Sequence, residues 1–200
     1  SATLPLIAQY NNLSFTGSGT SILANTDLVI NGNLSNSAGT IDNSLNNRNI
    51  DLYGNWTNTG ISFIPGTGTL SLKGSGTQTL MRTGGEQLYN LTIGGSGTKM
   101  LGGSIVLNND LVLNSSLDVD VLGNYSIDIK GNWSNTGTFI PQQGKVSFVG
   151  NTAQTINGST TFFDLTINNT SGGVSILGGA QNMAGGLDLV SGNFITTGQS

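Results

Sequence analysis

Three aspartates in the middle of the sequence are the strongest candidates for chemistry. Asp118 and Asp120 are two residues apart, and side chains at that spacing lie on the same face of a strand. Asp128 follows 8 residues later, with Lys130 nearby. Clustered carboxylates could bind Ca²⁺, which accepts several oxygen ligands in loose geometry, or a sugar. The alternative, which we favour, is that they are solvated charges that protect a strand edge.

The rest of the composition argues against catalysis. The 200 residues include no His and no Cys, which removes His-assisted nucleophiles, thiolate metal sites and disulfides. An active site should also interrupt a repetitive sequence, and no segment equipped for chemistry does so here. We therefore expect a protein that is not an enzyme and that has no cofactor and no resident metal.

The charges limit the partners in the same way. Six Lys and Arg against ten Asp and Glu give a net charge of −4, and the basic residues are scattered singly. Such a distribution offers no patch that could neutralise the phosphates of a nucleic acid. No apolar run reaches the ~18 residues that a membrane helix needs. We expect neither nucleic-acid binding nor membrane insertion.

The two tryptophans occupy equivalent places in a repeated motif. The motif consists of Gly54, Asn55 and Trp56 in one copy and of Gly131, Asn132 and Trp133 in the other. An exposed tryptophan could stack on a sugar ring. Because each indole sits between Gly-Asn and Asn-Thr-Gly, we instead expect both to fill a wide corner of the core. The neighbouring Asn amides would then satisfy the backbone of the turn.

This motif belongs to a long internal repeat of roughly 75 to 80 residues. Each copy continues with Phe-Ile-Pro, an apolar–polar–apolar triplet and Gln-Thr-Leu or Gln-Thr-Ile, over residues 63–80 and 139–156. A second landmark, Asn/Asp-Leu-Ser/Thr-Phe/Ile, occurs three times, at 12–15, 90–93 and 164–167. The long repeat indicates an architecture built from stacked units.

A shorter period lies within the long one. Ten apolar–polar–apolar triplets recur about every 19 residues, close to one coil of a parallel β-helix. They are Leu13/Phe15, Leu28/Ile30, Ile50/Leu52, Leu70/Leu72, Leu91/Ile93, Leu111/Leu113, Ile127/Ile129, Val146/Phe148, Leu165/Ile167 and Leu187/Leu189. The alternation is that of strands with one inward face, and turn residues usually follow each triplet. No helical periodicity is present, and a β-sandwich, the alternative all-β fold, would not readily explain two periods. We predict an all-β, right-handed parallel β-helix (β-solenoid) of about ten coils.

The domain prediction follows from this period. Residues 13–200 should form one continuous solenoid, with supermodules at about 13–90, 91–164 and, in part, 165–200. Residues 1–12 should be an extended N-terminal segment, in which Leu4, Leu6, Ile7 and Tyr10 could add as a strand to a neighbouring subunit. Neither end carries a cap helix or a charged cover. The chain is therefore expected either to stack end to end or to continue into a longer solenoid.

The motifs also carry a family resemblance. The order Gly-Asn-Trp-x-Asn-x-Gly, Phe-x-Pro, Val-x-Phe-x-Gly, Gln-Thr-Ile and Asn-Leu-Thr-Ile resembles repeats of large secreted proteins of Bacteroidetes, over about residues 10–197. The resemblance implies an adhesin-like protein that is extracellular or on the cell surface, exported with its signal peptide already removed. We expect a structural or adhesive rod or filament subunit. The alternative is a β-helix that binds surface glycans or degrades polysaccharide.

Overall fold

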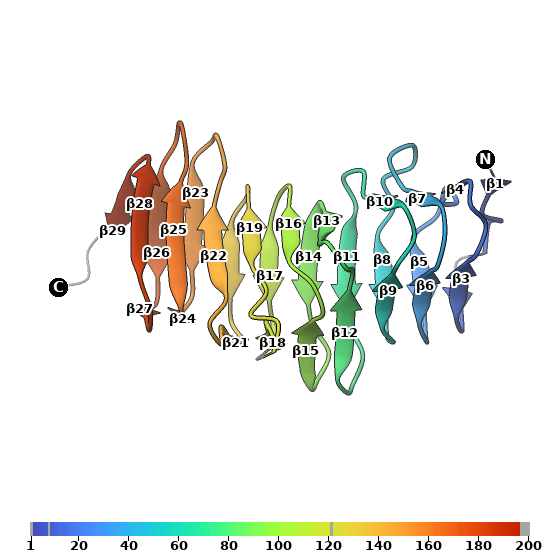
Figure 1. Ribbon diagram of the computed structural model, residues 1–200, viewed down its shortest axis with the longest axis horizontal. Helices are drawn as coiled ribbons and strands as arrows, with labels where there is room; N and C mark the ends of the chain where they lie inside the picture. The colour runs from blue at the N-terminus through green and yellow to red at the C-terminus, as the bar shows by residue number, and fades with distance from the viewer. Residues whose placement is uncertain (1, 8, 121, 197–200) are drawn as a thin grey trace.

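The computed structural model describes residues 2–7, 9–120 and 122–196, and it is all-β. The described residues form 29 strands of two to five residues each and no helix. The strands lie side by side along the long axis of the molecule, with the first strand, β1, and the last, β29, at opposite ends of the stack (Figure 1). Every strand pairing is parallel, so the predicted parallel β-helix is confirmed.

Consecutive strands cycle through three faces, so each coil contributes one strand to each face. Face 1 consists of β1 (Ala2–Thr3), β4 (Thr20–Ile22), β7 (Thr40–Asp42), β10 (Ser62–Ile64), β13 (Glu86–Leu88), β16 (Ile105–Leu107), β19 (Ile127–Ile129), β22 (Lys145–Phe148), β25 (Asp164–Asn168) and β28 (Leu187–Ser191). Face 2 consists of β2 (Gln9–Tyr10), β5 (Leu28–Ile30), β8 (Ile50–Leu52), β11 (Thr69–Leu72), β14 (Asn90–Ile93), β17 (Leu111–Leu113), β20 (Trp133–Asn135), β23 (Gln154–Asn157), β26 (Val174–Gly178) and β29 (Phe194–Thr196). Face 3 consists of β3 (Leu13–Phe15), β6 (Leu34–Asn36), β9 (Trp56–Asn58), β12 (Gln78–Met81), β15 (Thr98–Leu101), β18 (Ser116–Asp118), β21 (Thr138–Ile140), β24 (Thr160–Phe162) and β27 (Gln181–Met183).

The fold agrees with the prediction of about ten coils, but the coil length varies around the predicted 19 residues. At three strands each, the described strands make nine full coils and two further strands. One coil is 18 residues long between Thr98 and its partner Ser116, and another is 24 residues long between Trp56 and Leu80. The ten apolar triplets do not mark one face, because the first lies on face 3, the next five on face 2 and the last four on face 1. The ten triplets were therefore counted as one series although they belong to strands on three different faces.

The core is a column of inward-facing side chains. Within one strand Leu91 and Ile93 are fully buried while Thr92 between them faces outward, as the alternation of a strand requires. Leu91 pairs with Leu70 on the coil before and with Leu111 on the coil after. The buried apolar residues form one cluster that extends from the third strand to β26. No coil could bury its own apolar side, so the stacking itself provides the core.

The long repeat does not return to the same face. Trp56 lies in β9 on face 3, and its equivalent Trp133 lies in β20 on face 2, 11 strands later. The second landmark shows the same step, because its three copies lie in β3, β14 and β25, on faces 3, 2 and 1. Since 11 strands are not a multiple of three, each copy of the repeat begins one face further around the solenoid.

Each copy of the long repeat also contains one break in the sheets. The pairing on face 1 stops at β10 and resumes at β13, and that on face 3 stops at β21 and resumes at β24. Pro65 and Pro141 directly follow β10 and β21, and proline has no N–H to donate to a ladder. The Trp56 ring meets Phe63 edge-on behind the first break, with the ring centroids 4.9 Å apart. The bulky ring pair and the proline together account for the interruption.

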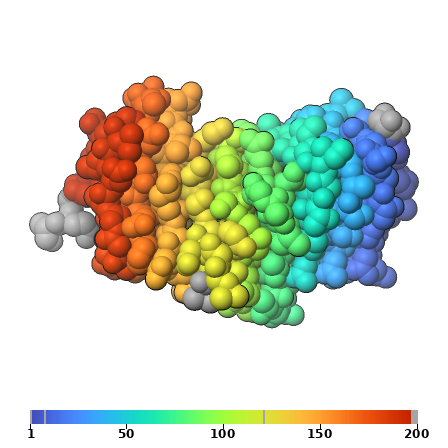
Figure 2. Space-filling model, viewed as in Figure 1, coloured from blue at the N-terminus to red at the C-terminus, as the bar shows by residue number. Residues whose placement is uncertain are grey.

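The N-terminal segment belongs to the solenoid. Strand β1 pairs with β4 through Ala2 and Ser21, and β2 pairs with β5 through Gln9 and Val29. Residues 2–7 and 9–12 therefore start the first coil, which corrects the expectation of a separate extended segment. The coils then follow one another in chain order along an elongated body (Figure 2).

Candidate functional site

The three candidate aspartates do not form one cluster. The Asp118 carboxylate accepts hydrogen bonds from the backbone N–H of Asp120 at 2.9 Å and from the side-chain amide of Gln142 at 3.0 Å. Asp120 lies beyond the end of its strand with φ of 65°, so the alternation that would align it with Asp118 no longer applies. Asp128 lies on face 1 in β19, while Asp118 lies on face 3. No group of three or more His, Cys, Asp or Glu in the described residues could hold a metal ion.

Both tryptophans are core residues, as predicted. Trp56 and Trp133 are each 0% exposed, so neither indole can stack on a sugar. Trp56 Nε1 donates to the Glu86 carboxylate at 2.9 Å, and Trp133 Nε1 donates to the Thr160 hydroxyl at 3.2 Å. Each ring also meets a phenylalanine edge-on, a favourable arrangement for aromatic pairs.

The glycines of the repeated motif are required by close approach of the coils. A Cβ on Gly54 would overlap the backbone carbonyl of Gly32, and one on Gly131 would overlap the backbone of Asn109. No side chain fits at either place, because the backbone of the preceding coil already occupies the space.

The asparagines beside those glycines link successive coils. The Asn33 side-chain oxygen accepts the backbone N–H of Asn55 at 2.8 Å, and the Asn55 oxygen accepts that of Thr79 at 2.9 Å. On face 2 the Asn132 oxygen in turn accepts the N–H of Thr155 at 3.0 Å. Each bond runs from a side chain of one coil to the backbone of the next. The expected role of these amides is confirmed, and they form an axial ladder.

Glu86 is a buried carboxylate that sequence reasoning missed. It is 3% exposed and accepts hydrogen bonds from Trp56 and, at 2.7 Å, from the amide of Asn58. Arg82 Nη1 lies 3.8 Å from its other oxygen. Burial raises the pKa of Glu86, while the two side-chain donors and the Arg82 charge oppose the rise. Glu86 is the one glutamate of the sequence, and this was the signal that could have singled it out.

Other buried polar side chains fasten the corners between faces. Gln78 Nε2 donates to the carbonyls of Leu52 and Gly54 at 3.0 and 2.5 Å, and Gln154 makes the equivalent bonds in the second copy. The Lys99 ammonium is buried and donates to three backbone carbonyls at 2.7 to 3.2 Å. Burial lowers the pKa of Lys99. These groups complete backbone hydrogen bonding, which is a structural role.

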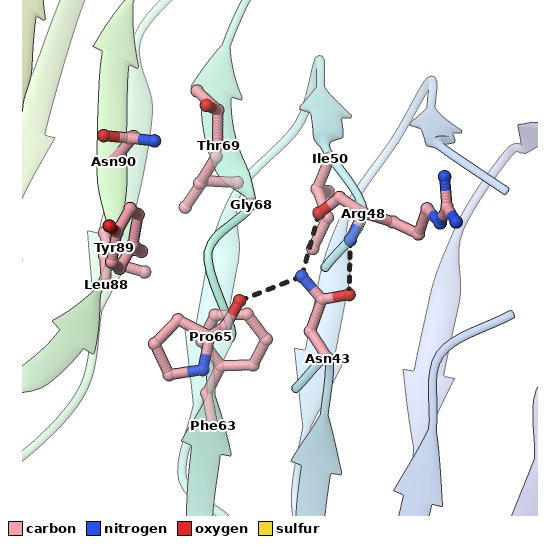
Figure 3. Close-up of a pocket in the computed structure, with 11 residues that line it drawn as sticks. Asn43, Arg48, Ile50, Phe63, Pro65, Gly68, Thr69, Leu88, Tyr89 and Asn90 are labelled. Carbon is pink, nitrogen blue, oxygen red and sulfur yellow. Dashed lines mark hydrogen bonds between the residues drawn. The ribbon is translucent and has the colours of Figure 1, made fainter. Parts of the chain in front are cut away.

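The interior offers no space for a ligand at the break on face 1. The cavity there is lined by Asn43, Arg48, Phe63 and Pro65 among others and has a volume of about 10 Å³ (Figure 3). Asn43 spans it, because its Nδ2 donates to the carbonyls of Arg48 at 2.8 Å and Pro65 at 3.0 Å. One water molecule is the most that such a volume can hold.

The outer surface has broader, shallow hollows on all three faces. The hollow on face 2 measures about 360 Å³ and is lined by Asp27, Leu28, Val29, Asn49, Asp51, Thr69, Ser71 and Lys73. The hollow on face 1 measures about 250 Å³ and is lined by Lys145, Asp164, Leu165, Thr166, Gly186, Leu187 and Asp188. The hollow on face 3 measures about 470 Å³ and is lined by Asn12, Ser14, Asn33, Ser35, Asn55 and Thr57. Each of the three lies across successive coils and is lined largely by outward-facing side chains.

The predicted assembly residues divide into two groups. Leu4 and Tyr10 pack against the core, whereas Leu6 is 76% and Ile7 47% exposed. At the opposite end of the stack, apolar side chains of the last coil are exposed as well, and they include Leu187, Leu189 and Ile195.

Comparisons with known proteins returned no match. No protein-family model matches the chain, and no curated protein and no solved structure matches it. Among the described residues, no helix is long and apolar enough to span a membrane.

Proposed function

We propose that the protein is a non-catalytic structural and adhesive element, a stiff rod or filament subunit that is extracellular or on the cell surface. The observation that carries the proposal is the continuous stacking of coils along one axis, with a single core cluster inside three parallel faces. A solenoid of this kind resists extension because each coil contacts its neighbours through three strands and a shared core.

The axial side-chain ladders support the same function. Four side-chain oxygens each accept a backbone N–H of the following coil, at distances of 2.7 to 3.0 Å. They belong to Asn33, Asn55, Asp110 and Asn132. These bonds lie at or next to the first residues of strands, beside backbone bonds between the same coils such as that from the Gly54 N–H to the Gly32 carbonyl. They therefore add side-chain links to the backbone links between coils.

The first and last described coils carry few charged side chains. The described residues of the first coil, 2–7 and 9–22, contain no charged side chain, and 174–196 contain only Asp188. Charged residues on edge strands are a usual means of preventing strand addition. The partners proposed here are a second copy stacked end to end or further coils of a longer chain. Export to the cell exterior is proposed from the resemblance of the repeats to secreted Bacteroidetes proteins.

A glycan-cleaving function is not proposed. Such chemistry uses two carboxyl groups that face each other across the substrate. Asp118 instead holds the turn that follows it, and Asp128 belongs to another face.

Negative-stain electron microscopy of the purified chain and of native material tests the proposal. We expect rods, with end-to-end polymers or longer parent molecules in the native sample. Compact single particles in both samples would overturn it. A screen against soluble polysaccharides should show no cleavage products.

A further inference from the structure

We propose that the hollow on face 2 is a binding site for a neutral saccharide. The inference rests on the proposed adhesive function and names the chemical class that the rod would hold. The face-2 hollow lies across β5, β8 and β11, and its polar lining comprises Asp27, Asn49, Asp51, Thr69, Ser71 and Lys73.

The first argument comes from the internal repeat. The position of Lys73 is occupied by Val149 in the second copy, that of Tyr53 by Lys130, and that of Asp27 by Ser104. The second copy builds the same coils without these three side chains, so the scaffold does not require them. The sequence alone showed no equipped segment that interrupts the repeat, but the structure brings two of these departures, Asp27 and Lys73, together with Asp51 in the face-2 hollow. A binding site is expected where such departures gather.

The second argument is the ion pair in the hollow. Lys73 Nζ lies 2.6 Å from Asp51 Oδ2, and the two side chains are 40% and 29% exposed. The pair leaves the other Asp51 oxygen as an acceptor and two ammonium protons as donors. The hydroxyls of Thr69 and Ser71 make no hydrogen bond within the described part of the protein. The hollow therefore offers charged donors and acceptors side by side, already oriented by their mutual bond.

The residues at the floor and at the edge of the face-2 hollow determine its shape. Ser71 is only 8% exposed and Val29 is the outward side chain of β5, so the floor is made of small groups. Tyr53 is 43% exposed and directly follows Leu52, the partner of Leu72, so it lies beside Lys73 of the next coil at the edge of the hollow. An exposed aromatic ring beside polar groups presents both an apolar surface and hydrogen-bonding partners to a ligand.

The charges select among ligands. Anions are disfavoured, because Asp27 and Asp51 outnumber Lys73 and the ammonium is already paired. A metal ion is disfavoured, because the Lys73 charge is adjacent and the Asp27 oxygens already accept the backbone N–H and the amide of Asn49. A neutral saccharide fits, because each hydroxyl can donate to a carboxylate and accept from an ammonium, while the C–H face of the ring can pack on Tyr53.

The experiment is titration of the intact chain with defined oligosaccharides, followed by saturation-transfer NMR and calorimetry. The probes are cellohexaose, laminarihexaose and mannohexaose, with oligogalacturonate as the anionic comparison. We expect at least one neutral probe to bind and both Asp51→Asn and Lys73→Met to weaken its binding at least about tenfold. Asp128→Asn, at the equivalent position on face 1, is the matched control and should leave binding unchanged.

Three results would overturn the site: no binding of any neutral probe, preference for the anionic probe, or equal binding by wild type and Lys73→Met. Small-angle scattering on the same samples measures the particle shape, and it therefore distinguishes failure of the saccharide site from failure of the proposed rod function. An elongated particle that binds no saccharide removes the face-2 site and leaves the rod in place. A compact particle removes the rod.

Discussion

The indole N–H of Trp56 donates to the carboxylate of Glu86 at 2.9 Å, and this bond joins face 3 to face 1 in the interior of the solenoid. In the second copy of the repeat the same indole proton is accepted by the hydroxyl of Thr160. In both copies the buried tryptophan N–H has a hydrogen-bond acceptor. The acceptor is the side chain of an acidic residue in the first copy and a neutral hydroxyl in the second.

This comparison predicts the cost of removing Glu86. Glu86→Ala should leave the Trp56 and Asn58 donors without an acceptor and lower the free energy of unfolding by about 1–3 kcal/mol. Glu86→Thr copies the second repeat and should cost less, because a hydroxyl can accept at that position. Chemical denaturation followed by tryptophan fluorescence measures both. Equal losses for the two variants would contradict the role of Glu86 as an acceptor.

Glu86 also predicts a dependence of stability on pH. Its pKa in the folded chain is raised above the ordinary 4.5, so the folded state binds the proton more tightly than the unfolded state does. The contribution of this group to stability is therefore complete below the ordinary value and is lost as the pH rises through the raised value. Glu86→Gln removes the titration. The stability of wild type relative to Glu86→Gln should fall as the pH rises above the ordinary value of 4.5, and a flat or rising difference in thermal unfolding would contradict this.

The glycines of the motif predict a steric effect. Gly54→Ala and Gly131→Ala should each destabilise the fold by about 1–3 kcal/mol or more, because the new methyl group would overlap the backbone of the preceding coil. Gly76→Ala is the control, since a Cβ at Gly76 meets no atom within 4 Å. Thermal unfolding by circular dichroism compares the three. A similar shift for Gly76→Ala would show that the loss does not come from close coil contact.

The end residues predict the behaviour of the rod in solution. Leu187 and Leu189 pair with Leu165 and Ile167 of the preceding coil and are 44% and 58% exposed, and no described strand pairs with β28 on its other side. The double change of both leucines to Glu should abolish end-to-end association, since it places charge on the open edge. Sedimentation velocity gives the readout. Leu122→Glu, at a 91% exposed position in a loop, should leave association unchanged.

Much of the fold could be predicted from the sequence, because its signals are local. The apolar–polar alternation of residues such as Leu91, Thr92 and Ile93 defines a strand and its inward side within three residues. The repetition of such strands favoured a stacked fold over a sandwich. The face on which each triplet lies could not be obtained in this way, because triplets on all three faces look alike and only the register between coils distinguishes them.

The candidate site was less predictable, because its partners are distant in sequence. Glu86 is buried by Trp56 and Asn58, which are 30 and 28 residues away. Asp118 and Asp120 were predicted to share a strand face, but the strand ends at Asp118 and the backbone turns. Lys73 could be assigned to the face-2 hollow only once Asp51 was known to lie beside it on the preceding coil.

The breaks in the sheets have a mechanical consequence. A break on the same side in every repeat would give the solenoid a row of weak points along one edge, and the molecule would bend like a hinge toward or away from that side. Instead the first break lies on face 1 and the second on face 3, because the repeat advances by 11 strands. In a longer array the weak points would follow a spiral and visit every side within three repeats. Flexural rigidity, averaged over three repeats, would then be the same in all directions, so the repeat length itself removes any preferred direction of bending.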